Sequence, residues 1–251
     1  MALPDLTARE IQAREMVCLP LDGLHSLGDV ENLVRELAPY VGLFKVGKES
    51  YTRFGPEVVE LVKSLDAGVF LDLKFHDIPN TVRGAASAAT ELGVSIFNVH
   101  ASGGSAMMGA ALLGVDDAAP PIGSRPKVIA VTVLTSIDRN ILNEECGVAG
   151  QVEQQVLRLA KLAQATDLDG IVCSAADMHA LKGELKPGFL FVTPGIKGTT
   201  TPAGEDQKRV LSPGRAVAAG SSLLVVGRAI TAAGDRTAAA REVLRDIANV
   251  L

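Results

Sequence analysis

The chain has 251 residues, of which 47% are hydrophobic and 21% are charged, so it can bury a large core and is not a disordered protein. Its net charge of −5 and the absence of any basic tract argue against nucleic acid or an anionic membrane as a partner. Charges such as Asp5, Arg9 and Glu10 exclude the apolar core of a signal peptide, and no apolar run approaches the length that spans a membrane.

Short apolar runs alternate with helical patterns along the whole chain, as in proteins that build a parallel sheet from strand–helix units. The predicted strands cover residues 16–21, 42–46, 69–74, 94–100, 127–134, 169–173, 188–192 and 222–226. The predicted helices cover residues 30–37, 56–65, 81–92, 105–113, 151–166, 175–181, 215–219 and 237–250. A further helix is expected over residues 6–16, ahead of the first strand.

Strands that are each followed by a helix or a turn predict an α/β protein, a (β/α)8 TIM barrel, as a single domain over residues 1–251. Residues 1–15 would form a helical extension at the bottom of the barrel, and an open doubly wound sheet is the alternative architecture. Residues 114–126 are expected to be a loop too short to separate domains. Residues 195–207, rich in Gly, Thr and Pro, are either a mobile lid over a ligand or an inert surface loop.

The most informative segment covers residues 70–81 and reads FLDLKFHDIPNT. Because strand side chains point to opposite faces in turn, Asp72, Lys74 and His76 share one face. The neighbouring strands look buried on both sides, so these charges are expected to point into an enclosed site. Asp77 follows at the end of the strand, which places alternating charges at one mouth of the barrel.

Active groups of barrel enzymes gather at the C-terminal ends of the strands. Those ends carry Asp22, Lys45, Asp72, Lys74, His100, Thr135, the turn 193–195, Gly227 and Arg228. Each residue alone has a structural explanation, since Asp22 or Asp77 suits a helix cap, Lys45 suits a solvated strand end and His100 suits the core. Together they predict a charged network, because buried charges are costly unless they are paired.

Gly227 and Arg228 end the last predicted strand and begin a helix. Free backbone N–H groups and the helix dipole favour an anion at such a position, and Arg228 adds a bidentate donor. Barrels often bind phosphate near their seventh and eighth strands. A phosphate-binding site is therefore predicted here.

A lysine flanked by two carboxylates keeps its proton, because both neighbours favour its charged form. Such a Lys74 suits the stabilisation of a developing carbanion and its protonation, whereas a Schiff-base lysine needs a lowered pKa. The residues thus predict proton transfer or decarboxylation on a phosphorylated substrate.

No metal and no organic cofactor are expected. The three cysteines are scattered and contain no CxxC pair, which favours a reduced, cytoplasmic protein, and the four histidines form no metal motif. No GxGxxG fingerprint precedes a helix, so a nicotinamide cofactor is not indicated.

Several motifs carry a family resemblance: FKVGKE (44–49), FLDLKFHDIPNT (70–81), NVHASGG (98–104), VTVLTS (131–136), TPGI (193–196) and VGR (226–228). In this order they resemble the orotidine 5′-phosphate decarboxylases, the bacterial type in particular, from about Val17 to the C-terminus. The resemblance implies a cytoplasmic homodimer of (β/α)8 barrels. It also implies conversion of orotidine 5′-phosphate to uridine 5′-phosphate (UMP) in pyrimidine biosynthesis, without metal or cofactor.

The resemblance also implies roles for individual residues. The catalytic charge network it implies consists of Lys45, Asp72, Lys74 and Asp77. Asp77 and Thr81 would reach across the dimer into the neighbour's site. The implied substrate-binding residues are Asp22 for the ribose, Lys45, Thr135 for the pyrimidine, Lys197 and Gln207 from the lid, and Gly227 with Arg228 for the phosphate.

Two positions depart from the family pattern. The first strand usually reads Ala-Leu-Asp there, whereas this chain has Pro20 before Leu21 and Asp22. Proline lacks a ladder donor, so a bulge or shifted register at Pro20 would move Asp22. Lys197 stands where the family usually has Arg, which keeps the charge and loses the bidentate fork.

Two other functions remain open at this point. One is a metal-dependent relative that acts on sugar phosphates as an aldolase or keto-acid decarboxylase. Such relatives resemble the chain around Asp72, Lys74 and Asp77 but carry an acidic metal ligand where Lys45 stands, and a cation there repels Mg²⁺. The other is a non-catalytic nucleotide-binding or scaffold barrel.

Overall fold

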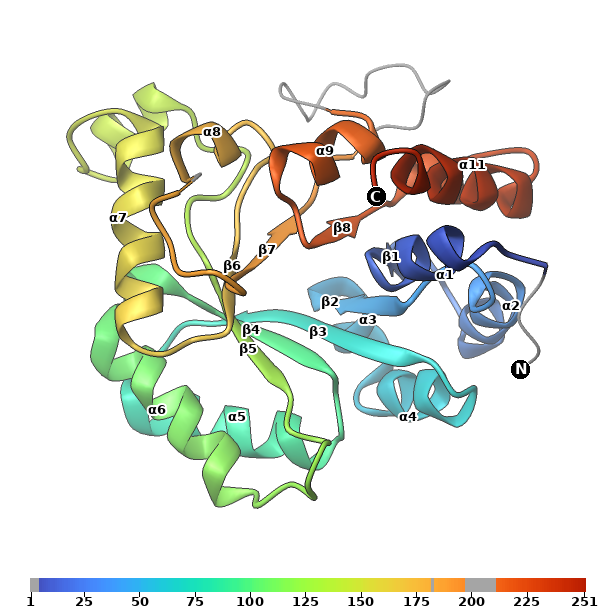
Figure 1. The fold of residues 1–251 in the computed structure, drawn as a ribbon. Helices are drawn as coiled ribbons and strands as arrows, with labels where there is room; N and C mark the ends of the chain where they lie inside the picture. The colour runs from blue at the N-terminus through green and yellow to red at the C-terminus, as the bar shows by residue number, and fades with distance from the viewer. Residues whose placement is uncertain (1–4, 182, 197–210) are drawn as a thin grey trace.

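The computed structural model describes residues 5–181, 183–196 and 211–251. Within them, parallel strands close into a barrel in the order β1-β2-β3-β4-β5-β6-β7-β8 (Figure 1). The strands are β1 (Val17–Pro20), β2 (Leu43–Gly47), β3 (Gly68–Phe75), β4 (Ile96–His100), β5 (Lys127–Val131), β6 (Gly170–Val172), β7 (Leu190–Thr193) and β8 (Leu223–Val225). Because β8 pairs with β1, the predicted closed barrel is confirmed and the open sheet is excluded.

The helices lie outside the strands (Figure 1). They are α1 (Ala8–Glu15), α2 (Leu27–Leu37), α3 (Lys48–Phe54), α4 (Glu57–Ser64), α5 (Pro79–Glu91), α6 (Gly104–Asp117), α7 (Val152–Ala165), α8 (Met178–Leu181), α9 (Pro213–Ala219), α10 (Arg228–Thr231) and α11 (Arg236–Ala248), with a 3₁₀ turn at Ala101–Gly103 and a π-helix at Ile141–Glu145. The α3 helix and the π-helix were not predicted. Among the described residues, no helix is long and apolar enough to cross a membrane.

The predicted N-terminal helix is present as α1. A capping box between Thr7 and Glu10 begins it, and Arg14 donates hydrogen bonds to the carbonyl oxygen of Ala38 after α2. A Cβ atom on Gly42 would lie 2.9 Å from the Arg14 carbonyl oxygen. The helix therefore lies beside the N-terminal ends of β1 and β2, and it packs against α11 (Figure 1).

The α6 helix continues to Asp117, so the prediction of a loop over residues 114–126 is wrong for its first turn. A Cβ atom on Gly114 would lie 2.1 Å from the Arg83 carbonyl oxygen of α5. Only glycine allows the two helices to approach this closely. Their packing outweighs the low helix propensity of Gly114.

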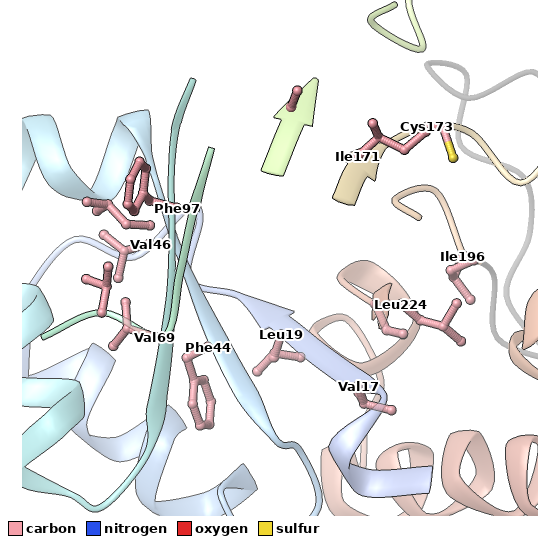
Figure 2. Close-up of a cluster of buried hydrophobic side chains, with 14 of the residues drawn as sticks. Val17, Leu19, Phe44, Val46, Val69, Phe97, Ile171, Cys173, Ile196 and Leu224 are labelled. Atoms are coloured by element: carbon pink, nitrogen blue, oxygen red, sulfur yellow. The ribbon is translucent and has the colours of Figure 1, made fainter. Parts of the chain in front are cut away.

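Alternation along the strands divides the buried residues into two sets. Residues such as Leu19, Phe44 and Phe97 point out toward the helices in one large apolar cluster (Figure 2). The second set fills the barrel interior and comprises Cys18, Phe70, Ile96, Ile129, Val192, Leu223 and Val225. Side chains that follow on the inward faces toward the C-terminal ends of the strands therefore meet above this apolar layer.

The strand that contains Pro20 is regular. β1, all of which the structure describes, pairs with β2 in register from Cys18 to Pro20, and the Leu21 N–H donates to the Lys45 carbonyl oxygen at 3.0 Å. The expected bulge or shift at Pro20 is therefore wrong. Proline is tolerated because it ends the strand. β8 pairs with β1 only up to Cys18, so the sheet needs no backbone donor from residue 20 on that side.

The irregular strand is β3. Its register with β4 runs from Phe70 to Leu71, is lost, and resumes at Phe75, which pairs with Val99. Within this break Lys74 has φ +54, in the left-handed region that residues with a Cβ atom rarely adopt. The distortion thus falls on the Asp72–Lys74 segment that the sequence predicts to carry chemistry.

Candidate active site

The ends of β1, β2 and β3 bring four of the predicted side chains together. Lys45 Nζ lies 3.2 Å from Asp22 Oδ2 and 3.3 Å from Asp72 Oδ2. Lys74 Nζ lies 2.6 Å from Asp72 Oδ1. The result is a row of alternating charge, Asp22, Lys45, Asp72 and Lys74, which we call the charge network.

Burial and pairing oppose each other in this charge network. Burial of Lys45, which is 8% exposed, favours its neutral form, but the carboxylates of Asp72 and Asp22 outweigh it and raise its pKa. Burial likewise favours neutral Asp72. The charges of Lys45 and Lys74 and hydrogen bonds from Lys74 and Asn98 outweigh it, so the pKa of Asp72 is lowered. Both groups stay charged near neutral pH, as a paired buried network requires.

Gly47 provides the space in which Lys45 meets Asp22. A Cβ atom at this position would lie 2.7 Å from Asp22 Oδ1 and 2.8 Å from Lys45 Nζ. These separations are too short for a carbon atom against either polar group. A side chain at the end of β2 would therefore push the ion pair apart.

The amide of Asn98 joins the charge network from β4. Its Nδ2 donates to Asp72 Oδ1 at 2.7 Å, and its Oδ1 accepts the backbone N–H of Lys74 at 2.8 Å. The sequence analysis did not select Asn98 as a site residue, although it lies within one of the motifs. The available signal was a single amide between apolar residues of a buried strand, on the same face as His100.

A cavity of about 190 Å³ opens beside the charge network. Lys45, Asp72 and Lys74 line it on one side. Its other lining residues are Phe70, Val131, Val133, Leu134, Thr135, Val172, Cys173, Pro194 and Val225. The cavity thus sets three charged groups against a largely apolar wall, an arrangement suited to a planar ring with one reactive, charged substituent.

Cys173 is part of this wall and not a second reactive group. Its thiol is buried, and burial followed by the nearby charge of Asp177 raises its pKa. A thiol that keeps its proton is a poor nucleophile.

Other predicted site residues lie outside this cavity. Asp77 and Thr81 are exposed, at the turn after β3 and in α5, and Asp77 Oδ1 accepts the N–H of Ile78 at 2.7 Å. Arg228 is exposed at the start of α10. Gly227 precedes it and packs on β1, since a Cβ atom there would lie 3.1 Å from Pro20 Cγ. Lys197, Gln207 and the rest of the predicted lid from residue 197 onward lie outside the described residues.

His100 lies at the end of β4 and faces His76, with the ring centroids 5.2 Å apart. Burial, then the nearby charges of His76, Lys48 and Lys74, lower the pKa of His100 to about 4. The ring is therefore neutral near pH 7. It is half-buried beside a second imidazole, unlike the core histidine that the sequence suggested as one explanation.

Comparison with known proteins agrees with this geometry. Residues 15–243 match the family described as "Orotidine 5′-phosphate decarboxylase / HUMPS family". A protein from Moorella thermoacetica named orotidine 5′-phosphate decarboxylase is 47% identical over 238 residues, which is 94% of each chain. One of the same name from Idiomarina loihiensis is 50% identical over 218 residues, covering 86% of this chain and 91% of the relative.

A solved structure supports the same assignment. The crystal structure of orotidine 5′-phosphate decarboxylase from Lactobacillus acidophilus matches with a TM-score of 0.80 and 36% identity. The match covers 92% of this chain and 98% of that one. The protein therefore belongs to the orotidine 5′-phosphate decarboxylase / HUMPS family.

Proposed function

We propose that this protein decarboxylates orotidine 5′-phosphate to UMP and CO₂ in pyrimidine biosynthesis. The observation that carries the proposal is the charge network beside a largely apolar cavity, in a chain that matches enzymes named for this reaction along most of its length. The alternating row keeps the buried ammonium of Lys45 charged and sets the Lys74 ammonium 2.6 Å from Asp72. A reaction that develops negative charge on a ring carbon needs this kind of environment.

Lys74 is the proposed catalytic cation and acid. When the bond between ring carbon C6 and the carboxylate breaks, CO₂ leaves and the electron pair stays on C6 in the plane of the ring, with little delocalisation. A fixed ammonium nearby lowers the energy of that carbanion, and it then transfers its proton to C6. The support is that Lys74 lines the cavity while its Nζ is held at 2.6 Å from Asp72.

Asp72 and Lys45 are the proposed supporting pair. Asp72 faces the departing carboxylate and orients Lys74, while Lys45 holds Asp72 from its other oxygen at 3.3 Å. Because these dipoles and charges are set before the reaction begins, little reorganisation is needed in the transition state.

The rest of the substrate would be bound around the cavity mouth. We infer that Thr135 contacts the pyrimidine, that the half-exposed carboxylate of Asp22 binds the ribose, and that Gly227 and Arg228 hold the phosphate. Lys197 and Gln207 would close over the nucleotide. Binding energy from the remote phosphate would then favour closure and so contribute to transition-state stabilisation.

A homodimer with Asp77 and Thr81 donated to the neighbouring site is part of the proposal. Both side chains are exposed in the single chain, and neither is among the described residues that line its own cavity. Next to Asp77, the apolar side chain of Ile78 is also 67% exposed in the single chain. We also propose a cytoplasmic location, as expected from the cysteine pattern.

The activity is tested by following the absorbance of orotidine 5′-phosphate with the purified protein and no added metal, with UMP identified as the product. Loss of activity in EDTA would instead favour the metal-dependent relatives that act on sugar phosphates. Tight UMP binding without any turnover would favour a non-catalytic nucleotide-binding barrel.

A further inference from the structure

Asn98 occupies the point at which β3 and β4 lose their register. β4 is regular on its other side, where Asn98 pairs with Ile129 of β5. On the β3 side, the pairing stops after Leu71 and resumes at Phe75. The backbone N–H of Lys74 lies inside that break and is bound by the side chain of Asn98. A side-chain amide thus takes the place of a ladder acceptor.

The Asn98 side chain is 1% exposed and binds two parts of the site at once. Its Oδ1 fixes the backbone of Lys74, and its Nδ2 fixes the Asp72 oxygen that also holds the Lys74 ammonium. Three groups therefore form one closed arrangement, from the Lys74 backbone through Asn98 and Asp72 back to the Lys74 side chain. An apolar side chain such as Leu could make neither bond, because one needs the amide Nδ2 as donor and the other needs the amide Oδ1 as acceptor.

We propose that Asn98 is a positioning residue for the decarboxylation, which sets the place of the Lys74 ammonium by tying its backbone and its Asp72 partner to β4. This inference rests on the proposed function and adds a residue to it. Lys74 has φ +54, a conformation that persists only when its surroundings impose it. Without the amide, the Lys74 N–H would lose its partner and the backbone would relax toward regular pairing with β4, which draws the ammonium away from its position.

The first test is Asn98→Ala. We expect kcat to fall about 100-fold, the usual order for loss of a hydrogen bond to a charged catalytic group. KM and UMP affinity should stay within about threefold, because substrate contacts are unchanged. A kcat within about threefold of the wild type, per folded molecule, would overturn the proposal.

A matched control is Asn143→Ala. The Asn143 amide also donates twice, but to the carbonyl oxygens of Val148 and Gly150 at 2.8 and 3.0 Å. We expect this variant to lower the melting temperature while kcat of the folded protein is unchanged. If both Asn variants lose kcat only in proportion to their lost stability, Asn98 has a structural role and the proposal fails.

Asn98→Asp gives a readout that stability alone would not move, and it decides the question if Asn98→Ala does not fold. A protonated carboxyl has the same shape as the amide, donates to Asp72 and accepts from Lys74, whereas the ionised form repels Asp72. Asp72, with Lys45 and Lys74 bound to it, faces position 98 from β3, His100 follows on β4, and β5 contributes apolar Ile129 and Val131. The new carboxyl therefore gains its proton as the pH falls.

We expect the ratio of variant to wild-type kcat to rise as the pH falls, by up to about tenfold per pH unit above the pKa of the new carboxyl, and to level off below that pKa. If the wild type is active and this kcat ratio does not change with pH, the proposed role of Asn98 is overturned and the proposed function stays intact. A wild-type protein without decarboxylase activity would overturn the proposed function itself, and this inference with it.

Discussion

β1 and β3 each bring an acidic side chain to the charge network, but their backbones do so in different ways. β1 is regular through Pro20, and Asp22 follows two residues after it. β3 loses its register with β4, and Lys74 adopts φ +54. Pro20, an unusual residue type for a strand, thus lies in regular backbone. Asp72 and Lys74, which are ordinary residue types there, lie where the backbone of β3 is irregular. The left-handed backbone at Lys74 therefore belongs to the way this part of the site is held, and residue propensity alone would not have located it.

The largest effect is expected from removing the proposed catalytic group on the irregular strand, β3. Lys74→Ala removes both the proposed cation and the proposed acid, so turnover should fall by about 10⁴-fold or more. UMP binding, measured by calorimetry, should remain detectable because the other contacts persist. Near-normal turnover would show that the distorted strand serves another purpose.

Mixing two inactive variants tests what lies beyond the end of β3. If Asp77 acts across a dimer, Lys74→Ala and Asp77→Ala chains mixed in equal amounts should form hybrids with one intact site. Activity should then return to about a quarter of the wild-type value at full subunit exchange. No recovery, with exchange verified by tagged chains, would place the action of Asp77 within its own chain.

The β1 side is tested through the space beside Asp22. Gly47→Ala puts a methyl group where Asp22 Oδ1 and Lys45 Nζ leave 2.7 and 2.8 Å, so the pair should separate. We expect kcat/KM to fall about tenfold, as for loss of one charge-assisted contact.

The matched control for this variant is Gly28→Ala in α2, where the nearest atom to a new Cβ is Ser26 Oγ at 3.7 Å. It should leave kcat/KM unchanged and raise helix stability by up to about 1 kcal/mol. Equal activity of the two variants would mean that the Asp22–Lys45 contact does not contribute to the reaction.

The smallest effect is expected from Pro20→Ala. Because β1 is already regular, the change should leave kcat unaltered and lower the free energy of unfolding by about 0.4–1 kcal/mol, through the freer unfolded chain. Urea unfolding measures the second quantity. A tenfold change in kcat would instead show that Pro20 steers Asp22, and the contrast between the two strands would disappear.

Much of the site could be predicted because strand ends converge in a parallel barrel. The hydrophobic pattern identifies three strands, and these charges lie in or just after their C-terminal halves: Lys45 in β2, Asp72 and Lys74 in β3, and Asp22 after β1. The closed barrel brings those strand ends to one mouth. Asn98 was not selected, because the role of an amide inside a buried strand depends on the neighbouring strand. Here that role follows from the register break in β3, which leaves the Lys74 N–H for Asn98 to accept. A bulge or shifted register was instead predicted at Pro20, because proline lacks a backbone donor. That prediction was wrong, because Pro20 ends β1 and a strand end needs no further donor.

Local patterns along the chain determined the order of strands and helices, the barrel and the four charges at its mouth. They could do so because hydrophobic periodicity and residue type are properties of residues close together in the sequence. Only the tertiary structure decided that α6 continues through Gly114, that β3 breaks from β4 around Lys74, and that Asn98 bridges the break. These features depend on contacts between residues distant in sequence, where close packing and the satisfaction of buried polar groups outweigh local preference.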